Sequence, residues 1–164
     1  MRNATWRALE DLLDEGKIKH IGVSNYSKRH LQELLGSCRN KPFVNQVELH
    51  PCLQQKDLAA YCREQGIKLQ AFGSLGGGDM GAPLLQNPTV ALIARDVEKT
   101  PAQVLLKWGL QKGFSVLPKS CEKTRIESNM NLDFDLKAEH MTQLDSMEQG
   151  TRYTWKGIDP DTVK

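Results

Sequence analysis

A cluster of polar residues between positions 116 and 129 has the groups needed to bind a phosphate. The segment reads V-L-P-K-S-C-E-K-T-R-I-E-S-N and follows a short apolar stretch that ends at Pro118. Lys119 supplies a cation and Ser120 a hydroxyl, while Arg125 and Asn129 lie one helical turn apart on a predicted helix. A cation, a hydroxyl and a helix start at the end of a strand favour a phosphate site. From these residues alone, a solvated basic loop is an equal alternative.

The elements that position this cluster follow from periodicity and from local start and stop signals. Ser27 and Thr100 are expected to cap helices, with Pro101 in the first turn of the second one. Gly16 suits the left-handed position after a helix. We expect strands at 18–23, 43–49, 67–72 and 114–117, and helices at 6–13, 28–35, 56–64, 88–97, 101–111, around Arg125 and at 138–147.

The first three strands start roughly 25 residues apart with a helix between them, which indicates parallel strands joined by crossovers. The predicted fold class is therefore α/β, with polar residues where the strands end, a position that carries the chemistry in (β/α) barrels. Four such units are half of an eight-unit barrel, which typically needs about 250 residues. These strand ends carry Ser24 and Asn25, then Gln46 with Glu48 and His50, then Phe72, then Lys119 and Ser120.

Composition predicts an ordinary globular chain and excludes several classes of function. The 164 residues are 39% hydrophobic and 26% charged, which suits one domain over 1–164 with an irregular tail at 148–164. The net charge of +2 is too small to indicate nucleic acid or an acidic membrane surface as partner. The four cysteines form no C-x-x-C pair, so we expect free thiols in a reducing compartment. The four histidines show no metal-ligand spacing, and we expect no metal site.

A glycine-rich motif at 76–81, G-G-G-D-M-G, matches the dinucleotide fingerprint G-x-G-x-x-G. That fingerprint requires a helix to open at its last glycine, whereas Ala82 and Pro83 follow here. We interpret the segment instead as a loop that folds over a bound ligand, with a plain surface linker as the alternative.

Four stretches in order resemble the aldo-keto reductases, which are NADPH-dependent (β/α)8 barrel enzymes that reduce aldehydes and ketones. They are the G-V-S-N turn at 22–25, V-N-Q-V-E-L-H-P at 44–51, the strand end and glycine loop at 72–76, and P-K-S with R-I-E-S-N at 118–129. The resemblance covers about residues 5–147. It implies that the chain is the C-terminal half of the barrel, with four parallel strands that correspond to strands 5 to 8.

At the nicotinamide end, the resemblance implies that Ser24, Asn25 and Gln46 bind the carboxamide. An amide needs both a donor and an acceptor, which Asn and Gln supply. Phe72 matches the aromatic residue that stacks on the nicotinamide ring, where the family commonly has tyrosine. The alternatives are that Ser24 and Asn25 only start a helix and that Phe72 is a core residue.

At the adenosine end, the resemblance implies that Lys119, Ser120 and Arg125 hold the 2′-phosphate and the nearby ribose. Asn129 matches the adenine contact, whereas Ser128 stands where many members have glutamate. The loop that crosses the pyrophosphate contributes Gly73, Leu75 and Gly76.

The implied function is NADPH-dependent reduction of aldehydes and ketones to alcohols, with this chain carrying the cofactor-binding half. The family's catalytic tyrosine, lysine, aspartate and histidine match no position here, so we expect no catalytic residue in the chain. The alternatives are an inactive fragment that binds nucleotide or a protein partner, and a purely structural fragment without a ligand.

The resemblance implies a small carbonyl compound as substrate and no nucleic-acid or membrane partner. It also implies a location in the cytoplasm. Four strands alone leave two unpaired sheet edges. We therefore also expect a second half-barrel, or self-association, to cover them.

Overall fold

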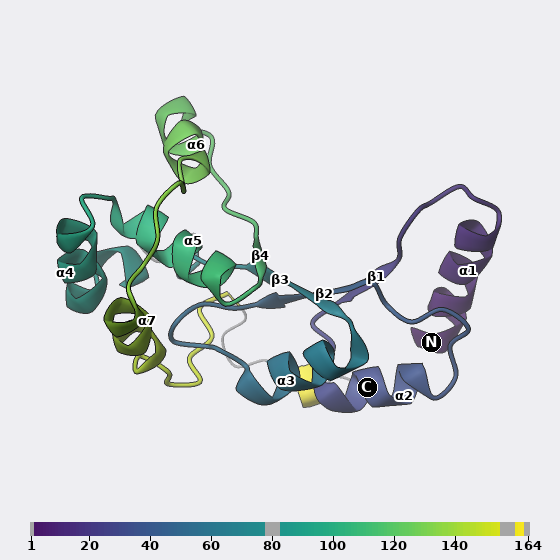
Figure 1. The fold of residues 1–164 in the computed structure, drawn as a ribbon. Helices are drawn as coiled ribbons and strands as arrows, with labels where there is room; N and C mark the ends of the chain where they lie inside the picture. Colours follow the sequence, from purple (N-terminus) through teal and green to yellow (C-terminus); the bar gives the residue numbers. More distant parts are fainter. Residues whose placement is uncertain (1, 78–82, 155–159, 163–164) are drawn as a thin grey trace. The chain divides into compact units, whose positions relative to one another are not determined.

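The computed structural model describes residues 2–77, 83–154 and 160–162, and its strands form one four-stranded sheet in the order β1-β2-β3-β4 (Figure 1). The strands are β1 (Gly22–Ser24), β2 (Val44–Glu48), β3 (Lys68–Phe72) and β4 (Ser115–Val116). The β1–β2 and β3–β4 pairs are parallel, and Ser24 is in register with Gln46. The predicted α/β class with four parallel strands is confirmed.

All four strands are shorter than predicted, and β1 and β4 are only half as long as expected. Ahead of β4, the Phe114 N–H donates to the Gly109 carbonyl at 3.0 Å and so belongs to the end of the preceding helix. Pro118 has no N–H to continue the ladder beyond it. Pairing of β1 with β2 begins at Gly22, where an added Cβ would lie 2.8 Å from the Val44 carbonyl oxygen. Only glycine allows the two backbones to approach this closely.

The helices confirm the capping predictions. The Ser27 side chain accepts a hydrogen bond from the His30 N–H, and Thr100 accepts one from Gln103. Gly16 has the left-handed φ of +70° that was expected after the first helix. The α-helices are α1 (Arg2–Asp14), α2 (Lys28–Leu35), α3 (Lys56–Gln65), α4 (Pro88–Asp96), α5 (Pro101–Gln111), α6 (Lys123–Met130) and α7 (Ala138–Asp145), and the short 3-10 helices are η1 (Pro83–Gln86) and η2 (Pro160–Thr162).

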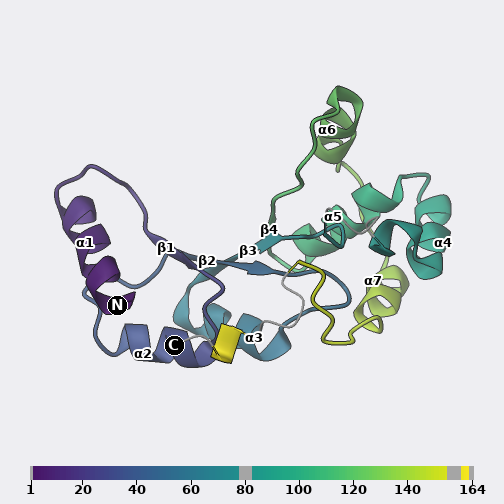
Figure 2. The ribbon, with the colours of Figure 1, turned by 180° about the vertical axis from the view of Figure 1, so that it is seen from behind.

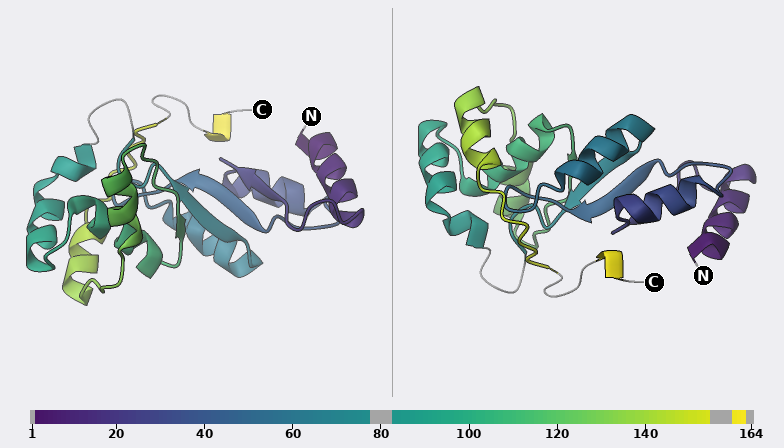
Figure 3. Two further views of the ribbon diagram at one scale, coloured as in Figure 1. Left: turned by 90° about the horizontal axis from the view of Figure 1, so that it is seen from above. Right: turned by 90° about the horizontal axis from the view of Figure 1, so that it is seen from below.

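The chain divides into two compact units. The first comprises the described residues of Met1–Val47, Lys56–Leu69 and Gly157–Lys164, and the second those of Glu48–Gln55 and Gln70–Lys156. In the first unit, α2 and α3 lie side by side on one face of the strands (Figure 3).

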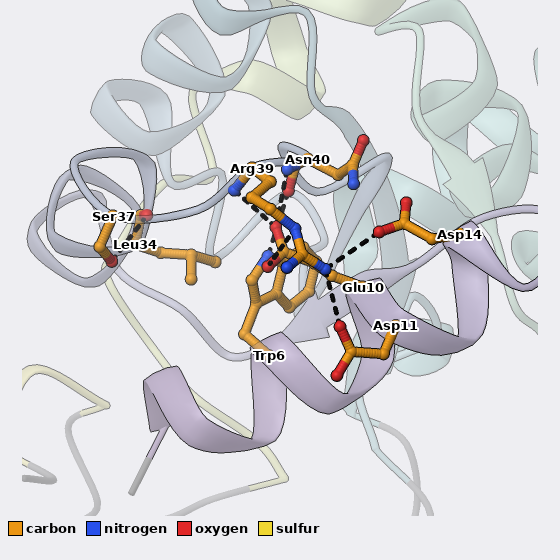
Figure 4. Close-up of polar contacts among 8 residues, drawn as sticks. All are labelled: Trp6, Glu10, Asp11, Asp14, Leu34, Ser37, Arg39 and Asn40. Carbon is orange, nitrogen blue, oxygen red and sulfur yellow. Dashed lines mark hydrogen bonds and ion pairs between the residues drawn. The ribbon is translucent and has the colours of Figure 1, made fainter.

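The first unit holds α1 against the rest of the unit with a buried carboxylate and an indole (Figure 4). Trp6 packs with Ile21 and Leu34, and its Nε1–H donates to the Asn40 carbonyl at 3.1 Å. Glu10, only 1% exposed, accepts the backbone N–H groups of Arg39 and Asn40 at 2.7 Å each through the same oxygen, Oε1. The Arg39 guanidinium lies over this cluster and bonds Asp11 and Asp14 at 2.8 and 3.0 Å.

The second unit is built around α5, whose inner face is apolar and which packs with α4 (Figure 2). A row of polar side chains, one per turn of α5, bonds to the backbone of the chain between α6 and α7. Lys107 Nζ donates to the Leu132 carbonyl at 3.3 Å, and the Gln111 amide exchanges two hydrogen bonds with the backbone of Leu136 at 3.1 and 2.8 Å. Gln103 begins the same row.

Cys38, Cys52, Cys62 and Cys121 are free thiols, as predicted from their spacing. Within residues 2–77, 83–154 and 160–162, no group of three or more His, Cys, Asp or Glu side chains is arranged to hold a metal ion. Across those same ranges, no helix has both the length and the apolar character required to cross a membrane.

Candidate functional site

The second unit contains a cavity of about 930 Å³ next to the ends of β3 and β4. Sites for small molecules and cofactors commonly measure about 300–1,000 Å³. Six of the residues predicted to bind cofactor line this cavity, namely Gly73, Leu75, Lys119, Ser120, Arg125 and Asn129.

Three segments form the walls of the cavity. The first follows β3, where Gly73 takes a left-handed φ of +65° and the Gly76 N–H closes a turn onto the Gly73 carbonyl at 2.8 Å. The second is the start of α5 at Thr100, Pro101 and Ala102. The third runs from the end of β4 through α6. The turns that follow the neighbouring strands β3 and β4 thus line the cavity together with α6, which contributes polar side chains.

The cations of the cavity have no carboxylate partner among the described residues. Lys119 and Arg125 are both exposed and line the cavity, and neither forms an ion pair there, unlike Arg29 and Arg39 of the first unit. Ser120 Oγ accepts the Glu122 N–H at 3.1 Å and retains its own proton for donation. Glu122 also lines the cavity and reduces its positive charge. This donor set fits the oxygens of a phosphate group.

A second group of predicted residues lies in the first unit, at the ends of β1 and β2. Ser24 Oγ donates to the Gln46 carbonyl at 3.1 Å, and the Asn25 N–H donates to the same carbonyl at 2.9 Å. Asn25 Nδ2 lies 3.4 Å from Ser24 Oγ. Asn25 has a φ of +55°, a left-handed conformation that asparagine tolerates better than most residues. Ser24, Asn25 and Gln46 therefore come together as one polar group.

Two further predicted residues belong to the second unit but are not in the cavity lining. Phe72 is half-buried and directly precedes the lining segment, and its carbonyl accepts the Leu49 N–H at 3.2 Å. Gly76 is buried against Leu84, whose Cβ would lie 3.1 Å from an added side chain. Of the glycine-rich motif at 76–81, positions 78–81 lie outside the described residues.

The lining also includes residues that the sequence did not single out. Thr154 joins from the tail, and Leu85 from η1. The start of α5 had one detectable signal, the cap sequence at Thr100 and Pro101. Thr154 had none, because its partner Glu48 is 106 residues away in the chain.

Glu48 fixes Thr154 at the edge of the cavity. Its Oε1 accepts the N–H groups of Tyr153 and Thr154 at 2.6 and 3.1 Å, and its Oε2 accepts the Thr154 hydroxyl at 2.6 Å. His50 Nε2 lies 3.2 Å from Oε1. Burial alone raises the pKa of this carboxyl, but the hydrogen bonds from His50, Thr154 and Tyr153 outweigh burial and lower the pKa from 4.5 to about 2.

Comparisons with known proteins find relatives over almost the whole chain. Residues 2–149 match the model of the Aldo/keto reductase family. A glyoxal reductase of Bacillus subtilis is 46% identical over 160 residues, 97% of this chain and 55% of that protein. A 9,11-endoperoxide prostaglandin H2 reductase of Trypanosoma cruzi is 44% identical over 158 residues, 96% of this chain and 54% of that protein.

Solved structures show the same relationship. MGS-M4, an aldo-keto reductase enzyme from a Medee basin deep-sea metagenome library, superimposes with a TM-score of 0.90 at 37% identity, over 98% of this chain and 59% of that one. The chain thus spans about half the length of the relatives it matches. On its sequence and on its fold, the chain belongs to the aldo/keto reductase family of oxidoreductases, which act on carbonyl compounds.

Proposed function

We propose that this chain binds NADPH and supplies the cofactor-binding part of an enzyme that reduces small aldehydes and ketones. The observation that carries the proposal is that Lys119 and Arg125, without carboxylate partners among the described residues, line one cavity with Ser120 and Asn129. NADPH differs from NADH by a 2′-phosphate, and a guanidinium forms strong paired hydrogen bonds with phosphate oxygens.

In this proposal the second unit holds the adenosine end of the cofactor. Arg125 and Lys119 bind the 2′-phosphate, Ser120 donates its hydroxyl, and the Asn129 amide bonds the adenine edge. The backbone at Gly73 and Leu75 lies beside the pyrophosphate, and Gly76 keeps that turn tight by packing against Leu84.

The polar group of the first unit holds the nicotinamide end. Ser24, Asn25 and Gln46 offer donors and acceptors that match a carboxamide. When bound, the cofactor supplies the hydride for a carbonyl carbon. We assign binding and orientation to the residues of this chain, and we assign the proton for the carbonyl oxygen to none of them.

The proposed substrates are small aldehydes and ketones. A relative that is 46% identical to this chain over 160 residues carries the name glyoxal reductase, so glyoxal is the aldehyde to test first.

Fluorescence titration with NADPH and NADH tests the binding part of the proposal. We expect the wild-type chain to bind NADPH more tightly, and Arg125→Ala to weaken NADPH binding by roughly 10- to 100-fold, since hydrogen bonds to charged groups contribute about 1.5–3 kcal/mol. NADH binding should change little. Arg95→Ala is the matched control, because Arg95 is an exposed cation on α4 of the same unit that does not line the cavity.

Equal losses for both cofactors in Arg125→Ala, or no NADPH binding by the wild-type chain, would overturn the proposal. An NADPH-consumption assay with glyoxal separates binding from catalysis. We expect binding without turnover, and turnover would place a proton donor within the chain.

A further inference from the structure

The helix that carries Arg125 and Asn129 has little packing of its own. None of the residues of α6 is buried, and its large apolar side chains are exposed, with Ile126 at 44% and Met130 at 80%. Helices in proteins usually gain their stability from a packed apolar face. The position of α6 must therefore depend on contacts other than an apolar interface.

One such contact is a buried amide on α5. Gln103 is 5% exposed, and its Nε2 donates to the carbonyl of Ser128 at 3.1 Å and to that of Asn131 at 2.8 Å. The last carbonyls of a helix have no partner within that helix. Gln103 thus bonds at the C-terminal end of α6 to the Ser128 carbonyl, which also accepts the Asn131 N–H at 3.1 Å, and to the carbonyl of Asn131, the residue that follows the helix.

The other end of the same amide is fixed at the start of α5. Gln103 Oε1 accepts the Thr100 N–H at 2.9 Å and the Thr100 hydroxyl at 3.1 Å, while the Gln103 N–H donates to Thr100 Oγ1 at 3.2 Å. This reciprocal capping box leaves the amide no freedom to rotate, because turning it would place donors against donors.

Gln103 thus connects two walls of the cavity. Thr100, Pro101 and Ala102 line it from α5, and Arg125 and Asn129 line it from α6. A single side chain that bonds to both walls sets the distance between them. We propose that Gln103 is a positioning residue that holds α6 in the place where Arg125 and Asn129 engage the cofactor. This proposal rests on the proposed NADPH-binding function.

The substitution Gln103→Glu separates the two halves of this contact. Glutamate keeps the oxygen that caps α5 and is the residue that commonly occupies this position of a capping box. It has no N–H to donate, and its second oxygen would face the carbonyls of Ser128 and Asn131. The link to α6 is lost while the cap on α5 remains.

Gln111→Glu is the matched control. Gln111 lies two turns further along α5 and its amide likewise donates to a backbone carbonyl, that of Leu136 at 3.1 Å, and neither residue lines the cavity. The two substitutions make the same chemical change at two points of the same row. Only one of these points bonds to α6.

Amide hydrogen exchange on the wild-type chain and both variants tests the positioning role without any ligand. We expect exchange of the α6 amides to accelerate at least tenfold in Gln103→Glu and to stay within twofold of wild type in Gln111→Glu, with α4 unchanged in both. If Gln103→Glu does not fold, Gln103→Met is measured in the same way, because methionine is similar in size and places no carboxylate there. Unchanged α6 exchange in the variant that folds overturns the inference.

The ratio of NADPH to NADH affinity tests the consequence for function. We expect Gln103→Glu to lower this ratio at least fivefold and Gln111→Glu to keep it. A wild-type ratio near one would overturn the proposed function, whatever the exchange data show. A wild-type preference for NADPH that Gln103→Glu leaves intact would overturn only the positioning role.

Discussion

Glu10 in the first unit and Glu48 in the second are buried carboxylates that each bind a distant stretch of backbone, and they differ in how many oxygens they use. Glu10 binds two N–H groups through Oε1 alone, and its other oxygen, Oε2, lies 3.9 Å from Arg39 Nε. Glu48 uses both oxygens, for two N–H groups, a hydroxyl and the His50 ring. Both side chains are 1% exposed.

The difference shows that burial alone does not determine what a carboxylate contributes. A neutral amide can reproduce what Oε1 of Glu10 does, because one carbonyl oxygen can accept two hydrogen bonds. Four donors around Glu48 stabilise the negative charge itself, and this is why its pKa falls to about 2 despite burial. Glu10 acts mainly as a hydrogen-bond acceptor, and Glu48 acts as a charge.

The largest effect on stability is expected when the same substitution, glutamate to glutamine, is made at Glu48 and at Glu10. Glu48→Gln should lower the free energy of unfolding by about 3 kcal/mol, which corresponds to the shift of the Glu48 pKa from 4.5 to about 2. Glu10→Gln should cost less than about 1 kcal/mol, because the Oε1 acceptor is kept. Urea unfolding of both variants measures the difference, and equal losses would contradict the distinction.

Acid should weaken the contact at Glu48 over a defined range of pH. The folded pKa of Glu48 is lower than the unfolded value, so the unfolded chain binds the extra proton and stability falls as pH drops from about 4.5 toward 2. By pH 3 this group alone should cost about 2 kcal/mol. Unfolding measured from pH 6 to pH 3 should be less dependent on pH in Glu48→Gln, and an unchanged slope would contradict the assignment.

The tail contact is expected to contribute less. Thr154→Val removes the hydroxyl that donates to Glu48 Oε2 and should lower stability by about 1–1.5 kcal/mol. Thr154→Ser keeps the hydroxyl and serves as the control, with a loss below about 0.5 kcal/mol. Chemical unfolding compares the pair, and a loss in Thr154→Ser as large as that in Thr154→Val would show that the methyl group contributes as much as the hydrogen bond.

The smallest effect is expected at the exposed guanidinium above Glu10. Arg39→Ala should lower stability less than any of the substitutions above, because its ion pairs with Asp11 and Asp14 are open to solvent and salt. The cost should shrink further in 0.5 M salt. A loss larger than that of Glu48→Gln would mean that the guanidinium, rather than the Glu10 acceptor, holds α1.

Local signals predicted the elements better than the contacts between them. The bounds of α2 and α5 agree with prediction, since Ser27, Thr100 and Pro101 act within one turn of the helix they start. The start of α1 was predicted at residue 6 instead of Arg2, because no capping residue marks it. β4 was predicted too long, since a hydrophobic run does not reveal where its backbone partners end.

For the site, the motif after β4 predicted the polar residues that line the cavity. It did not reveal Thr154 or the role of Gln103. In the sequence Gln103 shows only its local function as part of a capping box, whereas its bonds to Ser128 and Asn131 depend on how the chain returns to α5. Tertiary hydrogen bonds of this kind have no periodic pattern in the sequence.

The polar row on α5 affects which substitutions the chain can accept over evolutionary time. Most of its bonds end on backbone carbonyls, which every amino acid possesses. These bonds do not depend on which side chains stand between α6 and α7, although Asp135 adds an ion pair of its own to Lys107 at 3.0 Å. At Leu136 one substitution is excluded: its N–H donates to Gln111 Oε1 at 2.8 Å, and proline has no N–H to donate. Related sequences should therefore retain glutamine at the two anchoring positions of α5 more strictly than they retain the side chains whose backbone these glutamines bind.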